Sequence, residues 1–237
     1  MHIPDGYLGP ITYIAMFIIM IPIWLYAGYR VRKDLRSRQV PLLALSAAFT
    51  FVIMMFNVPI PGGSTGHAVG GAIIGIILGP WAAIVSISVA LIIQAFVFGD
   101  GGITAIGANC FNMGVVIPFI GYYAYKLISG NSDIKSVRRI AAAVIAGYLS
   151  LSIAAGFAGF EFGIQPYLYP AVNGQFPYMP YDLSVTLPAM LGEHMLFFSI
   201  LEALITGLVF IYFQRNEPSL LEDKKAVSRK IENKATA

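Results

Sequence analysis

The feature that most constrains the fold is a series of long apolar runs separated by short polar segments. Hydrophobic residues make up 57% of the 237 residues and charged residues only 11%, whereas soluble domains carry about 25% charged residues. The runs suit helices of roughly 20 residues that cross a bilayer, and they lack the alternation of membrane-barrel strands. The sequence therefore predicts an all-α integral membrane protein.

Two further features narrow the class. The first apolar segment has no basic residue ahead of it and is too long for a cleavable signal peptide, so none is expected. A single cysteine, Cys110, excludes an intrachain disulfide framework and a metal site built from several thiolates.

The basic residues are confined to three short segments, and these predict the topology. They are Arg30, Arg32, Lys33, Arg36 and Arg38; Lys126, Lys135, Arg138 and Arg139; and Arg215, Lys224, Lys225, Arg229, Lys230 and Lys234. Basic residues in short loops mark the cytoplasmic side. All three segments are expected there, so the number of spans between neighbouring segments is even.

Seven transmembrane helices satisfy this rule. The predicted helices cover about 9–29, 42–56, 67–79, 81–98, 107–125, 140–163 and 185–213, with Gly79-Pro80 separating the third from the fourth. The amino terminus then lies outside and the carboxyl terminus in the cytoplasm. Residues 1–213 are expected to form one transmembrane domain, and residues 214–237 a charged cytoplasmic tail. The external segments carry Asp100 and Asp182, with Asp5 and Glu161 on the same side, and such an acidic outer face suits capture of a cation.

The chain starts with a small metal chelate, Met1-His2, in the turn-prone stretch 1–6. The Met1 amine, the deprotonated His2 amide and the His2 Nδ1 atom can close two rings around one ion. Three corners of a square are then filled, and planar nitrogen coordination is typical of Ni(II) or Cu(II). Methionine is expected to stay on, because the second residue is large. The alternative is a disordered chain end.

A glycine-rich segment at 61–71 contains His67, which is expected at the outer end of the short third helix and can supply the fourth nitrogen. Gly71, Gly75 and Gly79 give that helix a small face for close packing. The alternative is a solvent-facing imidazole at a helix terminus. Ser64 lies in a G-x-S-x-G match without a predicted strand, so an intramembrane serine protease using Ser64 and His194 is the rival function.

Other polar groups within the apolar runs are expected around this site, because ionisable groups inside a membrane are costly and usually functional. Asn109 and Asn112 are expected to hydrogen-bond the amino-terminal loop. Gln94, Ser64, Glu193 and His194 are candidates for contacts behind the metal ligands, with Glu202 two turns deeper. Glu193 and His194 alternatively form a structural pair. No zinc-protease motif surrounds His194, and no P-loop lysine motif is present, so ATP would be hydrolysed by another chain.

These residues resemble the substrate-binding (S) component of nickel and cobalt energy-coupling-factor (ECF) transporters, of the NikM and CbiM kind. The matching stretches are 1–6, 62–71, 107–114, 147–152 and 194–207. The resemblance extends to about residue 213, and its combined motifs are specific.

The resemblance implies a seven-helix protein whose amino-terminal loop inserts into the bundle, with Met1, His2 and His67 as metal ligands. It also implies a transmembrane coupling subunit, two cytoplasmic ATPases of the ABC type and often a small accessory membrane subunit. We therefore expect a multi-pass protein of a prokaryotic plasma membrane that binds Ni(II), or Co(II), outside, without enzymatic activity or bound ATP. A third hypothesis is a metal-gated channel or a structural membrane protein without ATPase partners.

Overall fold

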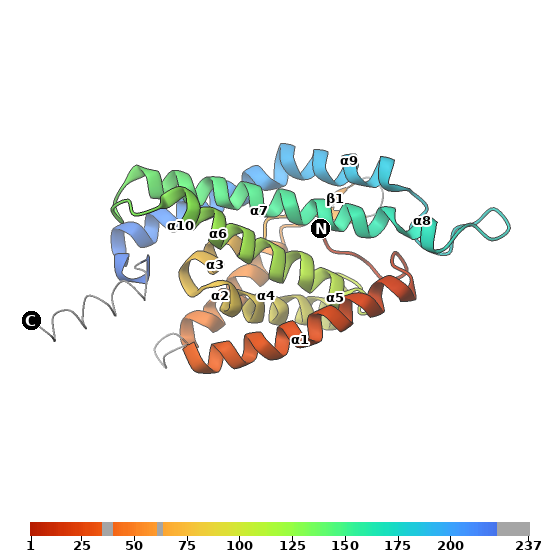
Figure 1. Cartoon of the computed structure of the whole chain (residues 1–237), viewed down its shortest axis with the longest axis horizontal. Helices are drawn as coiled ribbons and strands as arrows, with labels where there is room; N and C mark the ends of the chain where they lie inside the picture. The colour runs from red at the N-terminus through yellow and green to blue at the C-terminus, as the bar shows by residue number, and fades with distance from the viewer. Residues whose placement is uncertain (35–39, 61–63, 222–237) are drawn as a thin grey trace, which may run out of the picture.

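The computed structural model describes residues 1–34, 40–60 and 64–221, without the side chains of Ile60 and Ser64. The longer helices are α1 (Pro10–Asp34), α2 (Val40–Met54), α4 (Pro80–Ile93), α6 (Ile117–Ser129), α7 (Val137–Gly163), α9 (Leu183–Glu193) and α10 (Ser199–Asn216). Between α2 and α4 lies the shorter α3 (Gly71–Leu78). Short elements are α5 (Ile106–Asn109), α8 (Gln165–Leu168), the π-helical η2 (Gln94–Phe98), η3 (Cys110–Val116) and η4 (His194–Phe198), and the 3-10 turn η5 (Pro218–Leu221). Strands β1 (Val58–Ile60) and β2 (Ser64–Gly66) form an antiparallel hairpin with Pro59 opposite Thr65. The longer helices run roughly along one axis (Figure 1).

The mainly helical, apolar architecture confirms the predicted class. Within the described residues, four helical segments are long and apolar enough to cross a membrane: Pro10–Asp34, Pro80–Phe98, Val137–Leu168 and Leu183–Asn216. Helix α2 is also apolar but has 15 residues. The count of seven crossings and their orientation stay predictions.

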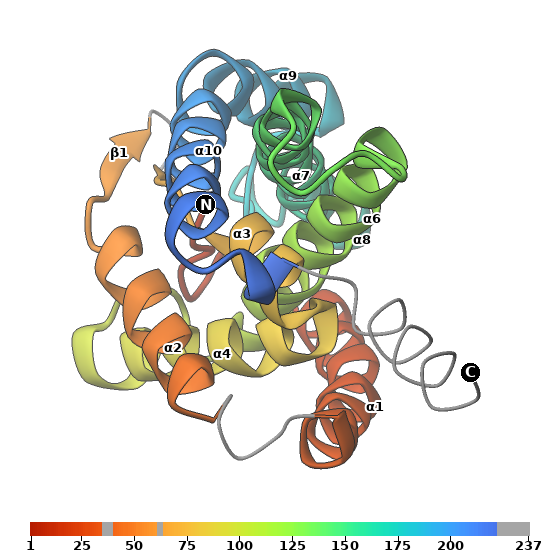
Figure 2. The same ribbon diagram turned by 90° about the vertical axis from the view of Figure 1, so that its left-hand side faces the viewer.

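The short helix α3 forms the centre of the bundle. Seen end-on, it lies inside a ring of longer helices, and the amino terminus lies beside it (Figure 2). Every residue of α3 except Ile77 is buried. A helix that is apolar on all sides must be covered on all sides, and this position meets that requirement.

Close helix packing around α3 depends on two of the three glycines expected to form its small face. A β-carbon on Gly75 would lie 2.8 Å from the backbone oxygen of Pro118 in α6, and one on Gly71 would lie 2.8 Å from the Ile117 side chain. Gly79 has a φ of 89° and meets nothing within 4 Å. It ends α3 instead of packing, as the predicted break before Pro80 requires.

Three expectations for the segment before α3 were wrong. The helix begins at Gly71, not at residue 67, because Gly70 adopts a φ of 71° that interrupts the helical backbone. His67 therefore lies in a stretch without regular secondary structure after β2, and not at the outer end of the helix. Ser64 does belong to a strand, β2, which the sequence did not predict. The serine opens that strand and does not form the strand-to-helix elbow of hydrolases.

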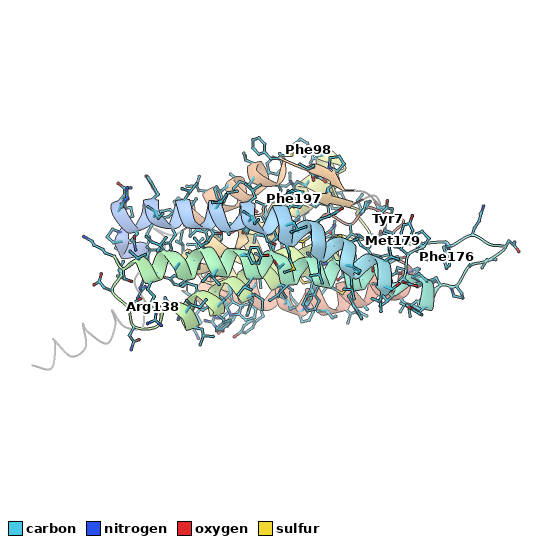
Figure 3. The ribbon with its side chains drawn as sticks, turned by 90° about the horizontal axis from the view of Figure 1, so that it is seen from above. Tyr7, Phe98, Arg138, Phe176, Met179 and Phe197 are labelled. Carbon is cyan, nitrogen blue, oxygen red and sulfur yellow. The ribbon has the colours of Figure 1, made fainter. Side chains whose placement is uncertain are left out.

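The two ends of the bundle differ in character. Tyr7, Phe176 and Met179 gather near one end, and Arg138 lies at the other (Figure 3). Along the sides, large apolar residues such as Phe98 and Phe197 are exposed, at 54% and 67%, which suits contact with lipid. Helix α10 continues to Asn216, and Leu221 of η5 is buried. The remainder of the expected tail, 222–237, lies outside the described residues.

The amino-terminal segment is fixed inside the bundle by paired hydrogen bonds. The Ile3 amide donates to Asn109 Oδ1 at 2.8 Å, and Asn109 Nδ2 donates back to the Ile3 carbonyl at 3.1 Å. The Gly102 amide also donates to that carbonyl, at 2.8 Å. Two residues on, the Asp5 carboxylate accepts from the Thr104 amide and hydroxyl. A buried backbone needs partners for its polar groups, and these contacts supply them.

The contact between α3 and α6 generates the first prediction. Gly75→Ala is expected to lower the thermal unfolding temperature in detergent, because overpacking against rigid backbone costs about 1–3 kcal/mol. Gly28→Ala is the matched control, since a β-carbon there meets nothing within 4 Å and alanine favours a helix. Equal stability of the two variants would contradict the described packing.

The paired bonds to Ile3 generate the second prediction. Asn109→Ala removes both contacts and is expected to raise amide hydrogen exchange at Ile3 by roughly tenfold or more, since each bond contributes about 1 kcal/mol. Asn109→Asp keeps one acceptor and is expected to show a smaller rise. Asn216→Ala, which loses only a bond to the Tyr212 carbonyl at the carboxyl end of α10, serves as the control. Unchanged exchange in Asn109→Ala would refute the anchoring role.

Candidate metal centre

The structure brings the two histidines predicted as ligands together across 65 residues. His67 Nε2 lies 3.1 Å from His2 Nδ1, and the ring centroids are 4.6 Å apart. Both side chains are buried, with residue exposures of 2% for His2 and 0% for His67. The atoms that face each other are those that the chelate hypothesis requires.

The Met1 amine lies in the same buried region. Met1 is fully buried, and its amine donates to Thr65 Oγ1 at 3.3 Å. Thr65 belongs to β2, so the hairpin brings the amine and His67 to one place. Burial lowers the pKa of the amine to about 4, although Asp100 and Glu193 act in the opposite direction. A neutral amine at pH 7 carries a lone pair that can bind a metal ion.

The hydrogen bonds of the two rings indicate which nitrogen atoms carry protons. The Nδ1–H of His67 donates to the Ala68 carbonyl at 3.0 Å, which directs the Nε2 lone pair toward His2. Burial and the neighbouring amino terminus lower the pKa of His2 to about 3, and a hydrogen bond to Gln94 opposes this. The His2 ring is therefore neutral at pH 7. A carbonyl contact of this kind fixes the tautomer of metal-binding histidines.

A carboxylate completes the surroundings of His2. Asp100 Oδ1 lies 3.3 Å from His2 Nδ1, and Asn57 Nδ2 approaches both oxygens of that carboxylate at 3.4 and 3.5 Å. Burial raises the pKa of Asp100. Because the acceptors His67 Nε2 and Asp100 Oδ1 both face it, His2 Nδ1 carries a hydrogen, which a metal ion bound there replaces. The sequence marked Asp100 only as part of an acidic face.

Glycines explain why the Asp100 loop can approach the amino terminus so closely. Gly101 has a φ of 85°, and a β-carbon there would lie 3.3 Å from the His2 ring. A β-carbon on Gly102 would lie 2.4 Å from the Asp5 amide. The run of glycines after Asp100 is a signal in the sequence for a close backbone approach, but it does not identify the partner.

The residues expected behind the ligands have different positions. Asn109 anchors Ile3, and Gln94 is fully buried beside His2. Glu193 is close enough to the amino terminus to act on it electrostatically. The Ser64 side chain lies outside the described residues.

Two of the expected polar contacts take other partners. His194 is fully buried and its Nδ1–H donates to the Met190 carbonyl at 2.9 Å, so it forms no described pair with Glu193. Asn112 was expected to bind the amino-terminal loop. It donates instead to the Glu161 carboxylate of α7 at 2.7 Å.

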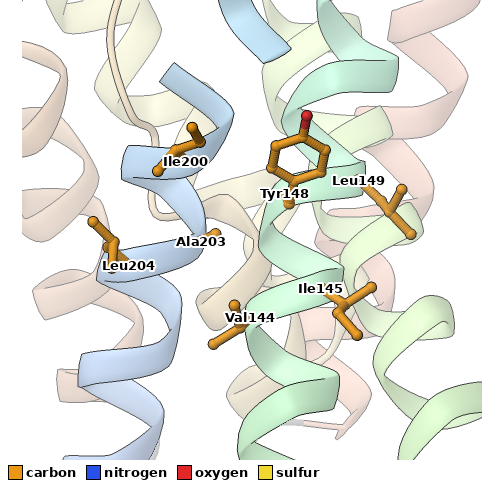
Figure 4. Close-up of a pocket in the computed structure, with 7 residues that line it drawn as sticks. All are labelled: Val144, Ile145, Tyr148, Leu149, Ile200, Ala203 and Leu204. Carbon is orange, nitrogen blue, oxygen red and sulfur yellow. The ribbon is translucent and has the colours of Figure 1, made fainter. Parts of the chain in front are cut away.

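Outside this region, the described residues offer fewer suitable donor atoms to a metal ion. No group of three or more His, Cys, Asp or Glu side chains suited to a metal occurs among these residues. A surface hollow of about 340 Å³ lies between α7 and α10 (Figure 4). Its lining is apolar apart from Tyr148, whose hydroxyl donates to the Met195 carbonyl. The hollow therefore has no suitable donors.

The donor set that remains is made of nitrogen. The amine of Met1, the amide and Nδ1 of His2, and Nε2 of His67 meet in one buried region. Four nitrogens of this kind suit a planar Ni(II) or Cu(II) complex.

Comparison with known proteins places the chain in a family. The family described as the cobalt uptake substrate-specific transmembrane region (CbiM) matches residues 2–220. A putative metal transport protein of Methanocaldococcus jannaschii is 47% identical, covering 95% of this chain and 96% of the relative. The fused nickel transport protein NikMN of Rhodobacter capsulatus is also 47% identical, and the match covers 95% of this chain but 65% of that protein.

A solved structure gives the same result in three dimensions. The crystal structure of a transition metal transporter superposes with a TM-score of 0.85 at 46% identity, covering 91% of this chain and 93% of the other. The match to the family over residues 2–220 and these relatives confirm the resemblance. The chain belongs to the CbiM family of nickel and cobalt uptake proteins, as a substrate-specific transmembrane component.

Proposed function

We propose that this chain is the S component of an ATP-driven ECF importer and captures Ni(II), with Co(II) as the alternative substrate, at the outer face of a prokaryotic plasma membrane. The observation that carries the proposal is the 3.1 Å approach of His67 Nε2 to His2 Nδ1 beside the buried Met1 amine. Nickel transport by the similar NikMN protein supports the choice of ion.

The proposed ligands are the Met1 amine, the His2 amide nitrogen, His2 Nδ1 and His67 Nε2. A deprotonated amide nitrogen and imidazole nitrogens in one plane create a strong ligand field, which favours planar Ni(II) over Zn(II) or Mn(II). Cu(II) binds such a site at least as tightly, so copper is excluded by its availability or by kinetics. The chelate requires a free amine at Met1, and the structure buries that residue fully.

The orientation follows from charge. The three basic segments lie in the cytoplasm, and seven crossings then put the amino terminus outside. Asp100, whose side chain is 23% exposed and contacts His2, lies on the proposed route of the cation to the site.

The chain needs partners for active transport. It carries no P-loop motif, so ATP hydrolysis belongs to two ABC-type ATPase subunits that act through a transmembrane coupling subunit. A small accessory membrane subunit is a further expected partner. The serine protease alternative, with Ser64 and His194, has no support from the relatives, which are described as transport proteins.

Extension of the amino terminus tests the chelate. One glycine added before Met1 converts the amine into an amide, and nickel affinity measured by isothermal titration is expected to fall by about a hundredfold or more, or ~2.8 kcal/mol. The same residue added at the carboxyl terminus is the control. Mass spectrometry checks that each chain starts as designed. Normal nickel binding by the extended protein would disprove the chelate.

Substitution of His67, the proposed ligand outside the amino-terminal segment, tests the fourth nitrogen. His67→Ala is expected to weaken nickel binding by about a hundredfold and to shift the visible absorption of the complex, because water replaces an imidazole in the plane. His194→Ala removes the third histidine of the chain, which is not a proposed ligand, and is expected to change the affinity less than tenfold. If the His194 variant loses the metal and the His67 variant keeps it, the ligand assignment is wrong.

A further inference from the structure

A buried carboxylate from a distant helix holds the backbone just beyond His67. Glu202 of α10 is fully buried. Its Oε2 atom accepts from the Val69 and Gly70 amides at 2.8 Å each, and its Oε1 atom accepts from the Ala72 amide at 3.4 Å. One side chain therefore satisfies three amides at the start of α3, across about 130 residues of sequence.

The local sequence offers no side-chain cap for these amides. The first N–H groups of any helix lack partners within the helix, and a Ser, Thr, Asp or Asn at the cap position usually supplies one. Here the cap position is Gly70, which has no side chain and a φ of 71°. The carboxylate from α10 replaces the local cap and lies at the positive end of the helix dipole.

The segment that carries His67 is held from several sides. Thr50 of α2 donates its hydroxyl to the Val69 carbonyl at 2.5 Å. A β-carbon on Gly66 would lie 1.9 Å from the Phe198 ring, which shows that this ring presses directly on the backbone before His67. Phe198 and Glu202 are four residues apart and therefore lie on one helical face. That face contacts the chain on both sides of His67.

An ionisable group buried in a membrane bundle is costly and usually functional, whereas a local Ser, Thr, Asp or Asn usually satisfies the start of a helix. The carboxylate accepts amide hydrogens from the residues two and three positions after His67. Those contacts fix the backbone that aims His67 Nε2 at His2 Nδ1.

We propose that Glu202 is a positioning residue for the metal site, which acts by holding the Val69–Ala72 backbone so that His67 Nε2 stays within reach of the ion. The inference rests on the proposed function, because His67 must be a ligand for its position to matter. It adds a residue that touches no metal yet sets the geometry of one ligand.

The test is a double-mutant cycle for nickel affinity in the purified full-length protein. Glu202→Gln keeps the size of the side chain, but its NH2 group faces an amide that needs an acceptor. Binding is expected to weaken by roughly 10–100-fold, the usual effect of a residue behind a metal ligand. In the His67→Ala background the same change is expected to alter the affinity less than about twofold, because coupled residues are not additive.

A matched control separates positioning from general damage. Glu161 of α7 is also buried, at 5% exposure, and its carboxylate accepts from Asn112, not from the His67 segment. Glu161→Gln is expected to leave the nickel affinity within about threefold of the wild type. The visible spectrum of the nickel complex is expected to shift toward that of His67→Ala in Glu202→Gln and to stay that of the wild type in Glu161→Gln.

A second variant covers the case in which Glu202→Gln does not fold. Thr50→Val removes the hydrogen bond to the Val69 carbonyl and is expected to shift the spectrum in the same direction as Glu202→Gln. Thr50→Ser keeps the hydroxyl and is expected to keep the wild-type spectrum. The inference is overturned if Glu202→Gln binds like the wild type, if its effect adds fully to that of His67→Ala, or if Thr50→Val in a folded protein has no effect. If His67→Ala itself binds nickel normally, the proposed function has failed instead.

Discussion

The approach of His2 to His67 depends on the amino-terminal segment leaving the surface and entering the bundle. A polar backbone inside an apolar bundle is stable only if its amides and carbonyls find partners. Asn109 satisfies both polar groups of Ile3, and Gly102 adds a second donor to its carbonyl. Burial also favours the neutral amine and neutral rings. The environment that tolerates the segment thus leaves the amine and the imidazole nitrogens neutral, as the proposed metal site requires.

Backbone irregularity is concentrated around this region. The irregular stretch through His67 and the left-handed Gly70 lead directly into the short buried helix α3. Non-helical backbone at membrane depth is tolerated where protein surrounds it. The glycines at 66, 101 and 102 leave no side chain where Phe198, His2 and Asp5 approach. These glycines therefore permit close packing beside the candidate ligands.

The sequence predicted the membrane class, the break between Gly79 and Pro80, the anchoring by Asn109 and the residues that meet at the site. Those predictions rest on local chemistry: apolar length, helix-breaking residues and the chelating order of Met1 and His2. The sequence did not reveal the β1–β2 hairpin, the start of α3 at Gly71, the contact of Asp100 with His2 or the bonds of Glu202 to Val69 and Gly70. The last two depend on tertiary contacts between residues far apart in the sequence, which single-sequence patterns do not encode. The hairpin and the start of α3 depend on local backbone conformation, such as the φ of 71° at Gly70. Asn112 illustrates the limit, because it is as polar as Asn109 but pairs with Glu161.

The proposed ligand set is tested most directly by anomalous X-ray diffraction at the nickel absorption edge, on crystals of the full chain grown with Ni(II). A single anomalous peak is expected within bonding distance of the Met1 amine, the His2 amide and Nδ1 atoms, and His67 Nε2, with these four atoms in one plane. A peak bound by carboxylate oxygens, or one remote from the amino terminus, would contradict the account.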